Sequence, residues 1–349
     1  MAASSEIAPA PEDSLGRPLH KLRISVTDRC NLRCSYCMPR ESYTWLPREH
    51  LLTFDEITRL VRVLATLGIG RLRLTGGEPL LRRDLAVLVA QLAHVEGIRS
   101  VALTTNGVLL AEQASALHSA GLQGLTVSLD SLREDRFERI AGRARLHDVL
   151  AGLDRAHEVG FERMKTNTVV VRGFNDDELV DLVELARARQ IEPRFIEYMD
   201  VGGATDWRPE SVVSRADILA RLAARYGTPL QLRNRDGAPA DRFQLPDGMT
   251  VGIISSTSQP FCRSCDRARL TSDGMLLTCL YAQAGLDLRG LLRGGADDRA
   301  LGSELGARWR ARADRGAEER LELGRPRGPW VAADALVRDP HLEMHKRGG

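Results

Sequence analysis

The chain has 349 residues, of which 43% are hydrophobic and 28% charged, and its formal net charge is +2. This composition is that of an ordinary soluble enzyme, long enough for one barrel-sized α/β domain and a smaller appended unit. The small net charge argues against a broad basic face for nucleic acid, and no apolar run is long enough for a membrane span. We therefore expect neither partner.

The first fifteen residues are rich in Ala, Ser and Pro and include Glu6, Glu12 and Asp13. They lack the basic start and apolar stretch of a secretion signal. We expect a disordered extension over residues 1–15 and a cytoplasmic protein.

Short β-branched or Leu-rich runs alternate with amphipathic helical patterns between residues 22 and 199, with a period of about 30 residues. Thr53 and Glu56 form a capping-box pattern, and residues 175–177 would open another helix. Alternating strands and helices give parallel strands that curl toward a barrel. The pattern predicts an incomplete (βα)6 TIM-like barrel over residues 16–200, with strands at 22–26, 72–75, 100–104, 125–129, 166–171 and 194–199.

The alternation stops after Asp200. Residues 202–248 form a polar stretch around one helix at 215–226, and residues 250–255 resemble a strand. A hairpin is expected from 269–271 and 275–280 around Asp273-Gly274, and an Arg-rich surface follows Asp297. We expect residues 201–349 to be a smaller α+β domain that closes the open side of the barrel.

The six cysteines fall into two triplets. Six cysteines are too few for a disulfide scaffold in a chain of 349 residues. Cys30, Cys34 and Cys37 follow the first predicted strand, at the end where barrels carry their chemistry. Three thiolates on one loop can hold three irons of a [4Fe-4S] cluster and leave the fourth iron open. Zinc usually takes a fourth protein ligand and disulfides need an even number of cysteines, so the spacing favours the cluster.

The second triplet is Cys262, Cys265 and Cys279, and it brackets the predicted hairpin. Folding the hairpin would return Cys279 to the side of Cys265. A zinc knuckle is the main alternative, but no His or fourth Cys lies within the hairpin. The pattern favours a second three-cysteine [4Fe-4S] cluster, whose free iron a substrate atom could bind.

Gly76-Gly77 follows the second strand, where two glycines permit close backbone approach to a ligand, although a plain glycine turn is the more common explanation of such a pair taken alone. Arg267 and Arg269 alternate on an extended segment and would point to one side. A single Arg is usually a surface ion pair. However, only Lys21, Lys165 and Lys346 of the 49 basic residues are Lys, which singles out the strand position of Lys165.

The spacing Cys-x3-Cys-x2-Cys, with Tyr36 before the last cysteine, resembles the signature of radical S-adenosylmethionine (SAM) enzymes. The resemblance implies that the open iron of the first cluster chelates SAM, whose reductive cleavage gives a 5′-deoxyadenosyl radical. It also implies that SAM is contacted by four residues: Tyr36, Gly77 of the Gly-Gly-Glu motif, Ser128 and Met199.

Within that superfamily, residues 22–30, 195–200 and 261–270 and the final Gly348-Gly349 resemble the GTP 3′,8-cyclases, lyases that begin molybdenum cofactor (molybdopterin) biosynthesis. The resemblance implies conversion of GTP into 3′,8-cyclo-7,8-dihydro-GTP, with an active-site tail at Gly348 and Gly349. Lys346 and Arg347 replace the family's more apolar approach to that tail. The implied GTP contacts are Arg23, Arg73, Thr104, Lys165, Arg267, Ala268 and Arg269.

The resemblance further implies an unidentified reductant and transfer of the product to cyclic pyranopterin monophosphate synthase, with the enzyme a monomer or homodimer. No Gly-x4-Gly-Lys-Ser/Thr segment is present, so a P-loop cannot hold the nucleotide. Two other functions stay open. A peptide-modifying radical SAM enzyme gives no reason for the basic residues to converge, and an iron–sulfur electron carrier leaves Gly76-Gly77 unexplained.

Overall fold

Strands and helices alternate through the first 200 residues of the computed structural model, which describes residues 10–40, 42–233, 237–323 and 328–348. All six predicted strands are confirmed to within two residues at either end. The strands are β1 (Lys21–Ser25), β2 (Arg71–Thr75), β3 (Ser100–Thr105), β4 (Gly124–Ser128), β5 (Met164–Val170) and β6 (Glu192–Glu197). The helices between them are α1 (Phe54–Thr66), α2 (Leu85–Ala93), α3 (Leu110–Ser119), α4 (Glu134–Ala141), α5 (Leu146–Val159) and α6 (Leu179–Ala188).

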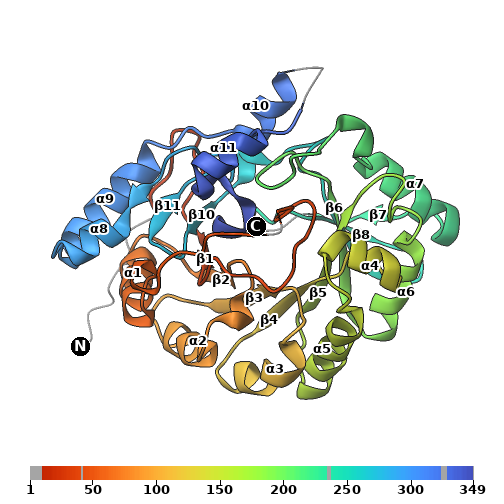
Figure 1. Cartoon of the computed structure of the whole chain (residues 1–349), viewed down its shortest axis with the longest axis horizontal. Coiled ribbons are helices and arrows are strands. Elements are labelled where there is room, and N and C mark those ends of the chain that lie inside the picture. Colours follow the sequence, from red (N-terminus) through yellow and green to blue (C-terminus); the bar gives the residue numbers. More distant parts are fainter. Residues whose placement is uncertain (1–9, 41, 234–236, 324–327, 349) are drawn as a thin grey trace.

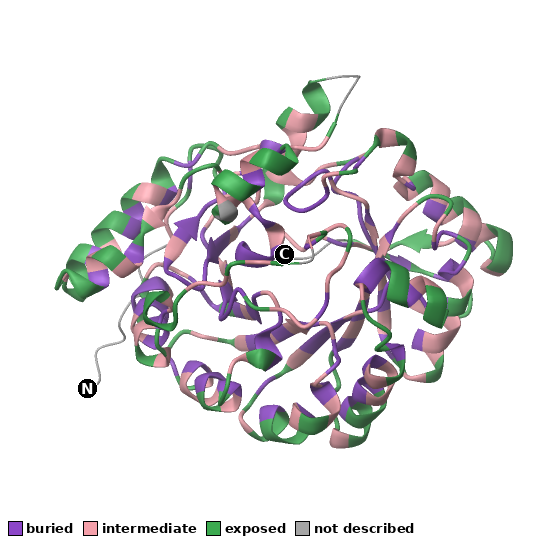
Figure 2. Cartoon of the chain, viewed as in Figure 1, coloured by how far each residue is buried: buried purple, intermediate pink, exposed green. Residues whose placement is uncertain are grey.

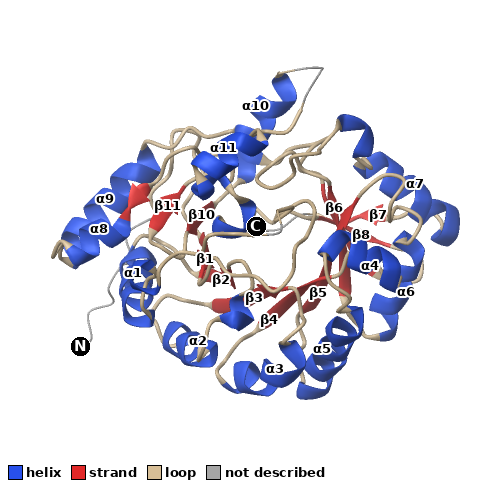
Figure 3. Cartoon of the chain, in the orientation of Figure 1, coloured by secondary structure: helices blue, strands red, loops and turns tan. Residues whose placement is uncertain are grey.

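The six strands are parallel neighbours in chain order and curve into an arc, with α1–α6 around its outside (Figures 1 and 3). Thr53 caps α1 as predicted: its hydroxyl accepts the Glu56 amide at 3.1 Å, and the Glu56 carboxylate accepts the Thr53 amide at 2.8 Å. The expected helix near residues 175–177 begins at Leu179. The Asn175 side chain instead donates to the carbonyls of Asp130 and Val169, bracing the ends of two strands.

The C-terminal strands extend both edges of the same sheet. They are β7 (Leu230–Gln231), β8 (Asp241–Gln244), β9 (Thr250–Ile254), β10 (Arg267–Leu270), β11 (Met275–Leu277) and β12 (Leu286–Asp287). β9 pairs in parallel with β6, and β10 pairs in parallel with β1. The predicted strand near residue 250 and the β10–β11 hairpin are confirmed, whereas the polar stretch before residue 248 contains two strands that its pattern does not reveal.

The remaining helices are α7 (Arg215–Tyr226), α8 (Leu288–Arg293), α9 (Asp298–Arg310), α10 (Gly316–Glu322) and α11 (Ala333–Arg338). α10, α11 and the C-terminal residues lie at the open side of the arc, between β10 and β6 (Figure 1). The C-terminal region therefore closes the partial barrel, as the sequence predicts. No helix in the described ranges is long and apolar enough to cross a membrane.

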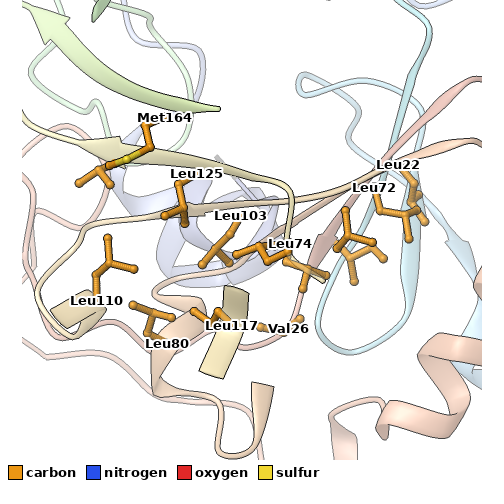
Figure 4. Close-up of a cluster of buried hydrophobic side chains, with 14 of the residues drawn as sticks. Leu22, Val26, Leu72, Leu74, Leu80, Leu103, Leu110, Leu117, Leu125 and Met164 are labelled. Carbon is orange, nitrogen blue, oxygen red and sulfur yellow. The ribbon is translucent and has the colours of Figure 1, made fainter. Parts of the chain in front are cut away.

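The hydrophobic core lies between the sheet and the outer helices. Leu22 on β1 pairs in register with Leu72 on β2, and Leu74, Leu103 and Leu125 pair in register across β2, β3 and β4; all five are almost fully buried (Figure 4). The helices present buried residues to the strands and exposed residues to solvent (Figure 2). This packing leaves the alternate strand positions, which face the barrel interior, free to carry polar side chains.

Those interior positions are strongly basic. Arg23 on β1 pairs in register with Arg73 on β2, and Lys165 on β5 pairs with Thr126 and Glu192. The interior of a TIM barrel is usually filled by branched apolar side chains. The basic positions here indicate a site for an anionic ligand rather than a packed core.

The expectation of a disordered extension is wrong for residues 10–15. Glu12 and Pro18 form an isolated antiparallel β-bridge. The buried Asp13 carboxylate forms ion pairs with Arg17 at 2.6 Å and with Arg312 at 3.2 Å. Long-range ion pairs leave no local sequence signal, which explains the error. Residues 1–9 lie outside the described residues.

Candidate active site

A cavity of about 320 Å³ lies over the C-terminal ends of the strands. Barrel enzymes place their chemistry at this end. Both cysteine triplets line it, although they are separated by more than 200 residues in the chain. The cavity also collects the carboxyl-end residues of β1–β6, including Thr75, Thr104, Ser128, Asn167 and Ile196.

The first triplet lies on the loop after β1. Backbone hydrogen bonds from Arg33 and Ser35 to the carbonyls of Ala141 and Ile140 fix the loop on the end of α4. The Leu32 amide donates to Cys30 Sγ at 3.4 Å, and the Asn106 amide group donates to the same sulfur at 3.8 Å. The loop is thus folded with donors already pointing at a ligand sulfur.

Burial raises the pKa of all three thiols in this triplet, that of Cys30 to about 11. Neighbouring carboxylates, Glu78 beside Cys30 and Asp130 beside Cys34, raise them further. Bare thiolates are therefore unfavourable here, and iron binding must displace protons from these sulfurs.

The second triplet is brought together by the hairpin as predicted. Cys262 begins a 3₁₀ turn, Cys265 precedes β10, and Cys279 follows β11. Arg267 donates to Cys265 Sγ at 3.6 Å, and the Tyr281 amide donates to Cys279 Sγ at 3.4 Å.

The second triplet differs from the first in its electrostatics. Burial opposes ionisation of Cys265, but the nearby Arg267 and Arg312 charges prevail and lower the pKa of this thiol to about 6. Burial raises the pKa of Cys262 and Cys279. Cys265 is thus the one ligand cysteine whose thiol pKa is lowered by neighbouring positive charges, whereas Cys30 and Cys34 lie beside carboxylates that raise theirs.

Both triplets fit a [4Fe-4S] cluster. All six cysteines are free thiols, each triplet faces the cavity, and N–H donors approach three of the sulfurs. In a cubane each thiolate binds its own iron, and N–H donors to the sulfurs tune the cluster. No three Cys, His, Asp or Glu side chains within the described ranges are arranged to hold a single metal ion.

The four residues expected to contact SAM, namely Tyr36, Gly77, Ser128 and Met199, all line the cavity. The Tyr36 hydroxyl donates to Asp130 at 2.7 Å, which holds the cysteine loop over the end of β4. A Cβ on Gly77 would collide with the Arg29 backbone, and the Gly77 amide donates to the Thr27 carbonyl at 2.8 Å. The glycine turn is therefore required by the adjoining loop, where we expected a bound ligand to require it.

The expected GTP contacts separate into three groups. Arg23, Thr104, Arg267 and Arg269 line the cavity, whereas Arg73 and Lys165 are not among the described residues that do. Arg73 lies directly behind Thr104, whose hydroxyl accepts its guanidinium at 3.1 Å. Ala268 is fully buried in the hydrophobic core on the opposite face of β10, so its side chain does not reach the cavity.

The basic side chains repel one another. Burial lowers the pKa of Arg23, and the charges of Arg269, Arg73 and Arg267 lower it further. Burial likewise lowers the pKa of Lys165 to about 8, with the Arg194 charge acting in the same direction. An anion bound among these groups would relieve both the repulsion and the loss of hydration.

The C-terminal residues run into this cavity. Arg269 donates to the carbonyl oxygens of Arg347 and Gly348 at 3.1 and 2.9 Å, and Met344 and His345 line the cavity. Gly348 has φ of +67°, and a Cβ there would lie 2.6 Å from Thr75 Cγ2. Gly349 lies outside the described residues.

Lys346 and Arg347 are buried rather than exposed at the entrance. Arg347 donates to the carbonyls of Leu280 and Ala282 at 2.8 and 2.5 Å, and its guanidinium lies 5.2 Å from the Trp330 ring centre. Arg347, one of the two residues that depart from the family pattern, thus anchors the tail.

Sequence reasoning missed Asn106, Asp130, Asn167 and Glu197, all of which line the cavity. Glu197 is fully buried and accepts the amides of Arg215, Thr257 and Ser258, so it ties β6 to α7 and to the loop after β9. Asn106, Asp130 and Glu197 lie at or within two residues of the C-terminal end of a strand, and Asn167 lies in the middle of β5. The strand-end position is the signal that could have identified the first three.

Two family models match the chain. Residues 24–186 match the Radical SAM superfamily, and residues 191–318 match Molybdenum Cofactor Synthesis C. The chain is 50% identical over 351 residues to GTP 3',8-cyclase 1 of Mycobacterium tuberculosis, covering 98% of both chains. It is 48% identical over 318 residues to the GTP 3',8-cyclase of Acidothermus cellulolyticus, covering 88% of each.

Among solved structures, Streptococcus suis SuiB bound to the precursor peptide SuiA matches with a TM-score of 0.58 at 18% identity, covering 82% of this chain and 66% of that one. This likeness shows the fold alone, and it agrees with the partial barrel of a radical SAM enzyme. Identity near 50% over almost the whole length, together with both family models, shows that the chain belongs to the GTP 3′,8-cyclase family of the radical SAM superfamily.

Proposed function

We propose that this chain is a GTP 3′,8-cyclase, a lyase that converts GTP into 3′,8-cyclo-7,8-dihydro-GTP in the first step of molybdenum cofactor biosynthesis. One observation carries the assignment: both cysteine triplets and the side chains of Arg23, Arg267 and Arg269 line a single cavity. A radical source, a second cluster and an anion-binding surface thus meet at one place.

The cysteines would hold two [4Fe-4S] clusters, Cys30, Cys34 and Cys37 the first and Cys262, Cys265 and Cys279 the second. When bound, the first cluster and SAM would supply the radical chemistry that activates the 3′ C–H bond of the GTP ribose. Tyr36, Gly77, Ser128 and Met199 lie where they can position SAM beside that cluster. Asp130 holds Tyr36 in place through the 2.7 Å hydrogen bond.

The chain's contribution to cyclisation is to position GTP. Arg23, Arg267 and Arg269 offer guanidinium donors suited to phosphate oxygens, and Thr104 with Arg73 behind it extends this surface toward β3. Lys165 on β5, which is not among the described residues that line the cavity, would add positive charge close to it. Holding the ribose 3′ carbon close to C8 of the guanine favours ring closure, which one further electron and a proton complete.

The tail residues Gly348 and Gly349 are proposed to complete the cavity. The Arg269 hydrogen bonds to Arg347 and Gly348 place the tail backbone among the basic side chains, where only a residue without Cβ fits beside Thr75. We do not propose a GTP contact for the Ala268 side chain. Ala268 separates Arg267 from Arg269 along β10, so that these two arginines point to the same face of the strand.

The wider setting is also part of the proposal. Six unpaired cysteines suit a reducing compartment, which supports a cytoplasmic location. An unidentified reductant would supply electrons, and cyclic pyranopterin monophosphate synthase would take the product. The enzyme would act as a monomer or homodimer. Residues 16–200 would form the SAM half, and residues 201–349 would supply the second cluster and the GTP contacts Arg267 and Arg269.

The test is anaerobic incubation of the reduced, reconstituted protein with SAM and each of GTP, ATP, CTP and UTP. We expect 5′-deoxyadenosine together with a cyclised product from GTP alone. Uncoupled SAM cleavage without any cyclised nucleotide would refute the assignment. Modification of a peptide in place of GTP would favour the peptide-modifying alternative.

A further inference from the structure

A buried ion cluster lies against the second cysteine triplet, on residues that neither the cavity nor the proposed chemistry uses. Asp13 accepts from Arg17 Nε at 2.6 Å and from Arg312 at 3.2 Å. The three residues are only 6%, 2% and 4% exposed. They come from the N-terminal segment and from the residues after α9, which are 299 positions apart for Asp13 and Arg312.

Each of the two guanidinium groups also holds the backbone of a cysteine. Arg17 donates to the carbonyl of Cys262 at 2.9 Å, and Arg312 donates to the carbonyl of Cys265 at 2.7 Å. These two carbonyls belong to the two nearby ligands of the triplet. The ion cluster therefore fixes the backbone of the Cys262–Cys265 turn through two hydrogen bonds.

The same network reaches the third ligand. Arg17 donates to the backbone carbonyl of Asp314 at 2.7 Å, and the Asp314 carboxylate accepts the Thr278 hydroxyl at 2.6 Å. Thr278 immediately precedes Cys279. All three ligand segments are thus connected to Arg17 or Arg312 through short hydrogen bonds.

The segment that carries Asp13 is itself rigidly held. The Asp13 carboxylate accepts the amides of Leu15 and Arg17 at 2.9 and 3.0 Å, which closes a tight turn. The indole of Trp309 donates to the Arg17 carbonyl at 3.0 Å, and Ser14 donates to the Arg312 carbonyl at 2.7 Å. The N-terminal segment is therefore docked on the end of α9 as a fixed part of this site.

Two guanidinium groups are buried around the Asp13 carboxylate, and the Asp314 carboxylate lies 3.6 Å from Arg312 Nε. Burying these charges is costly, and apolar side chains could fill the same contact without that cost. The network has a different effect: it fixes the positions of the Cys262 and Cys265 backbone carbonyls, in a turn that is not part of a strand. Ligand placement and the groups around the ligands govern metal affinity and cluster properties.

We propose that Asp13 is a positioning residue for the second iron–sulfur site: it keeps Arg17 and Arg312 in place, and these hold the Cys262 and Cys265 backbone in the ligating geometry. None of the three residues lines the cavity. The inference rests on the proposed function only in taking the second triplet as a cluster site.

The test uses Asp13→Asn in the full chain, because this change removes the charge and keeps the shape. Wild-type protein reconstituted with iron and sulfide should hold about eight irons per chain, and the variant about four. Electron paramagnetic resonance in a Cys30→Ala/Cys34→Ala/Cys37→Ala background isolates the second cluster. Its signal should be lost in the variant. The first cluster of Asp13→Asn alone should still cleave SAM to 5′-deoxyadenosine.

Asp298→Asn is the matched control, since Asp298 is an exposed carboxylate on α9 that forms a surface ion pair with Arg59 at 2.7 Å. It should leave both clusters unchanged. Arg17→Lys is a second, milder variant: an ammonium keeps the charge but lacks the fork that reaches Asp13, Cys262 and Asp314 together. It should shift the spectrum of the second cluster, and it decides the matter if Asp13→Asn does not fold.

Full iron content and an unaltered second-cluster spectrum in both variants would overturn the inference. Equal loss of iron from both sites in Arg17→Lys would also overturn it, because that result indicates a general fold defect. If wild-type protein holds no second cluster, the proposed function itself fails, which is a distinguishable result.

Discussion

Arg269 donates a hydrogen bond of 2.9 Å to the carbonyl oxygen of Gly348, so a proposed substrate-binding arginine also holds the C-terminal tail. The same guanidinium nitrogen donates to the Arg347 carbonyl at 3.1 Å. Burial lowers the pKa of Arg269 to about 10, with the Arg267 charge acting in the same direction. If Arg269 binds GTP as proposed, tail and substrate share one side chain, and changes in the tail should act on GTP rather than on SAM.

The first prediction concerns Gly348→Ala. The residue has a positive φ, and the new Cβ would lie 2.6 Å from Thr75 Cγ2, so the tail cannot keep its position. We expect cyclised product to fall at least tenfold while 5′-deoxyadenosine still forms, measured by chromatography of both products. Deletion of Gly348 and Gly349 should act in the same way.

Gly328→Ala is the control, because a Cβ at Gly328 meets nothing within 4 Å. It should leave turnover unchanged. Undiminished cyclisation in Gly348→Ala would mean that the tail has no part in the reaction and would leave the remaining site assignments standing.

The second prediction concerns the two triplets. Cys30→Ala should abolish 5′-deoxyadenosine formation, because the first cluster loses a ligand and SAM loses its site. Cys265→Ala should leave measurable SAM cleavage but no cyclised GTP, since the second site alone is affected. Each variant should lose about four of the expected eight irons by elemental analysis. Zinc at the second site in wild-type protein would contradict the two-cluster assignment.

Much of this site could be predicted from local sequence patterns. The βα period located all six barrel strands, and the turn at Asp273-Gly274 located the hairpin that brings Cys279 back to Cys265. The contacts that could not be predicted join distant segments: Asp13 to Arg312, and Arg347 to Leu280. A charged residue near a terminus is usually solvated, and nothing in its neighbours along the chain shows that it is buried.

The third prediction concerns Lys165. Lys165 is not among the described residues that line the cavity, so it would act on the GTP phosphates through its charge. Lys165→Ala should therefore weaken GTP binding by about tenfold, which corresponds to about 1.4 kcal/mol. Guanosine, which lacks the phosphates, should bind poorly to wild type and be insensitive to this change. Calorimetry or equilibrium dialysis under anaerobic conditions measures both. Equal affinity of wild type for GTP and guanosine would contradict the basic site.

The fourth prediction is the pH dependence that Lys165 imposes. Its pKa of about 8 means that the ammonium loses its proton, and its positive charge, as the pH rises through 8. GTP affinity should therefore be retained below pH 8 and decline between pH 8 and 9. The pKa values of Arg73 and Arg269, about 10, keep those charges in place over this window. Lys165→Arg should remove the decline, because Arg stays charged; a decline that persists would assign the titration to another group.

The last prediction concerns Arg347, which anchors the tail to the loop after Cys279. Its guanidinium donates to the carbonyls of Leu280, Ala282 and His341 and lies over Trp330. Arg347→Met preserves most of the side-chain volume but leaves these carbonyls without their donor, so the tail should dock less stably. Hydrogen–deuterium exchange of residues 343–348 should become faster, and cyclised product should fall while SAM cleavage persists.

Arg338→Met is the matched control, because the Arg338 side chain on α11 is 75% exposed and pairs with the nearby Asp334. Surface ion pairs contribute little, so this control should change neither measurement. Unchanged exchange and turnover in Arg347→Met would mean that other contacts are sufficient to hold the tail, among them the Arg269 hydrogen bond and the packing of His345 against Tyr43.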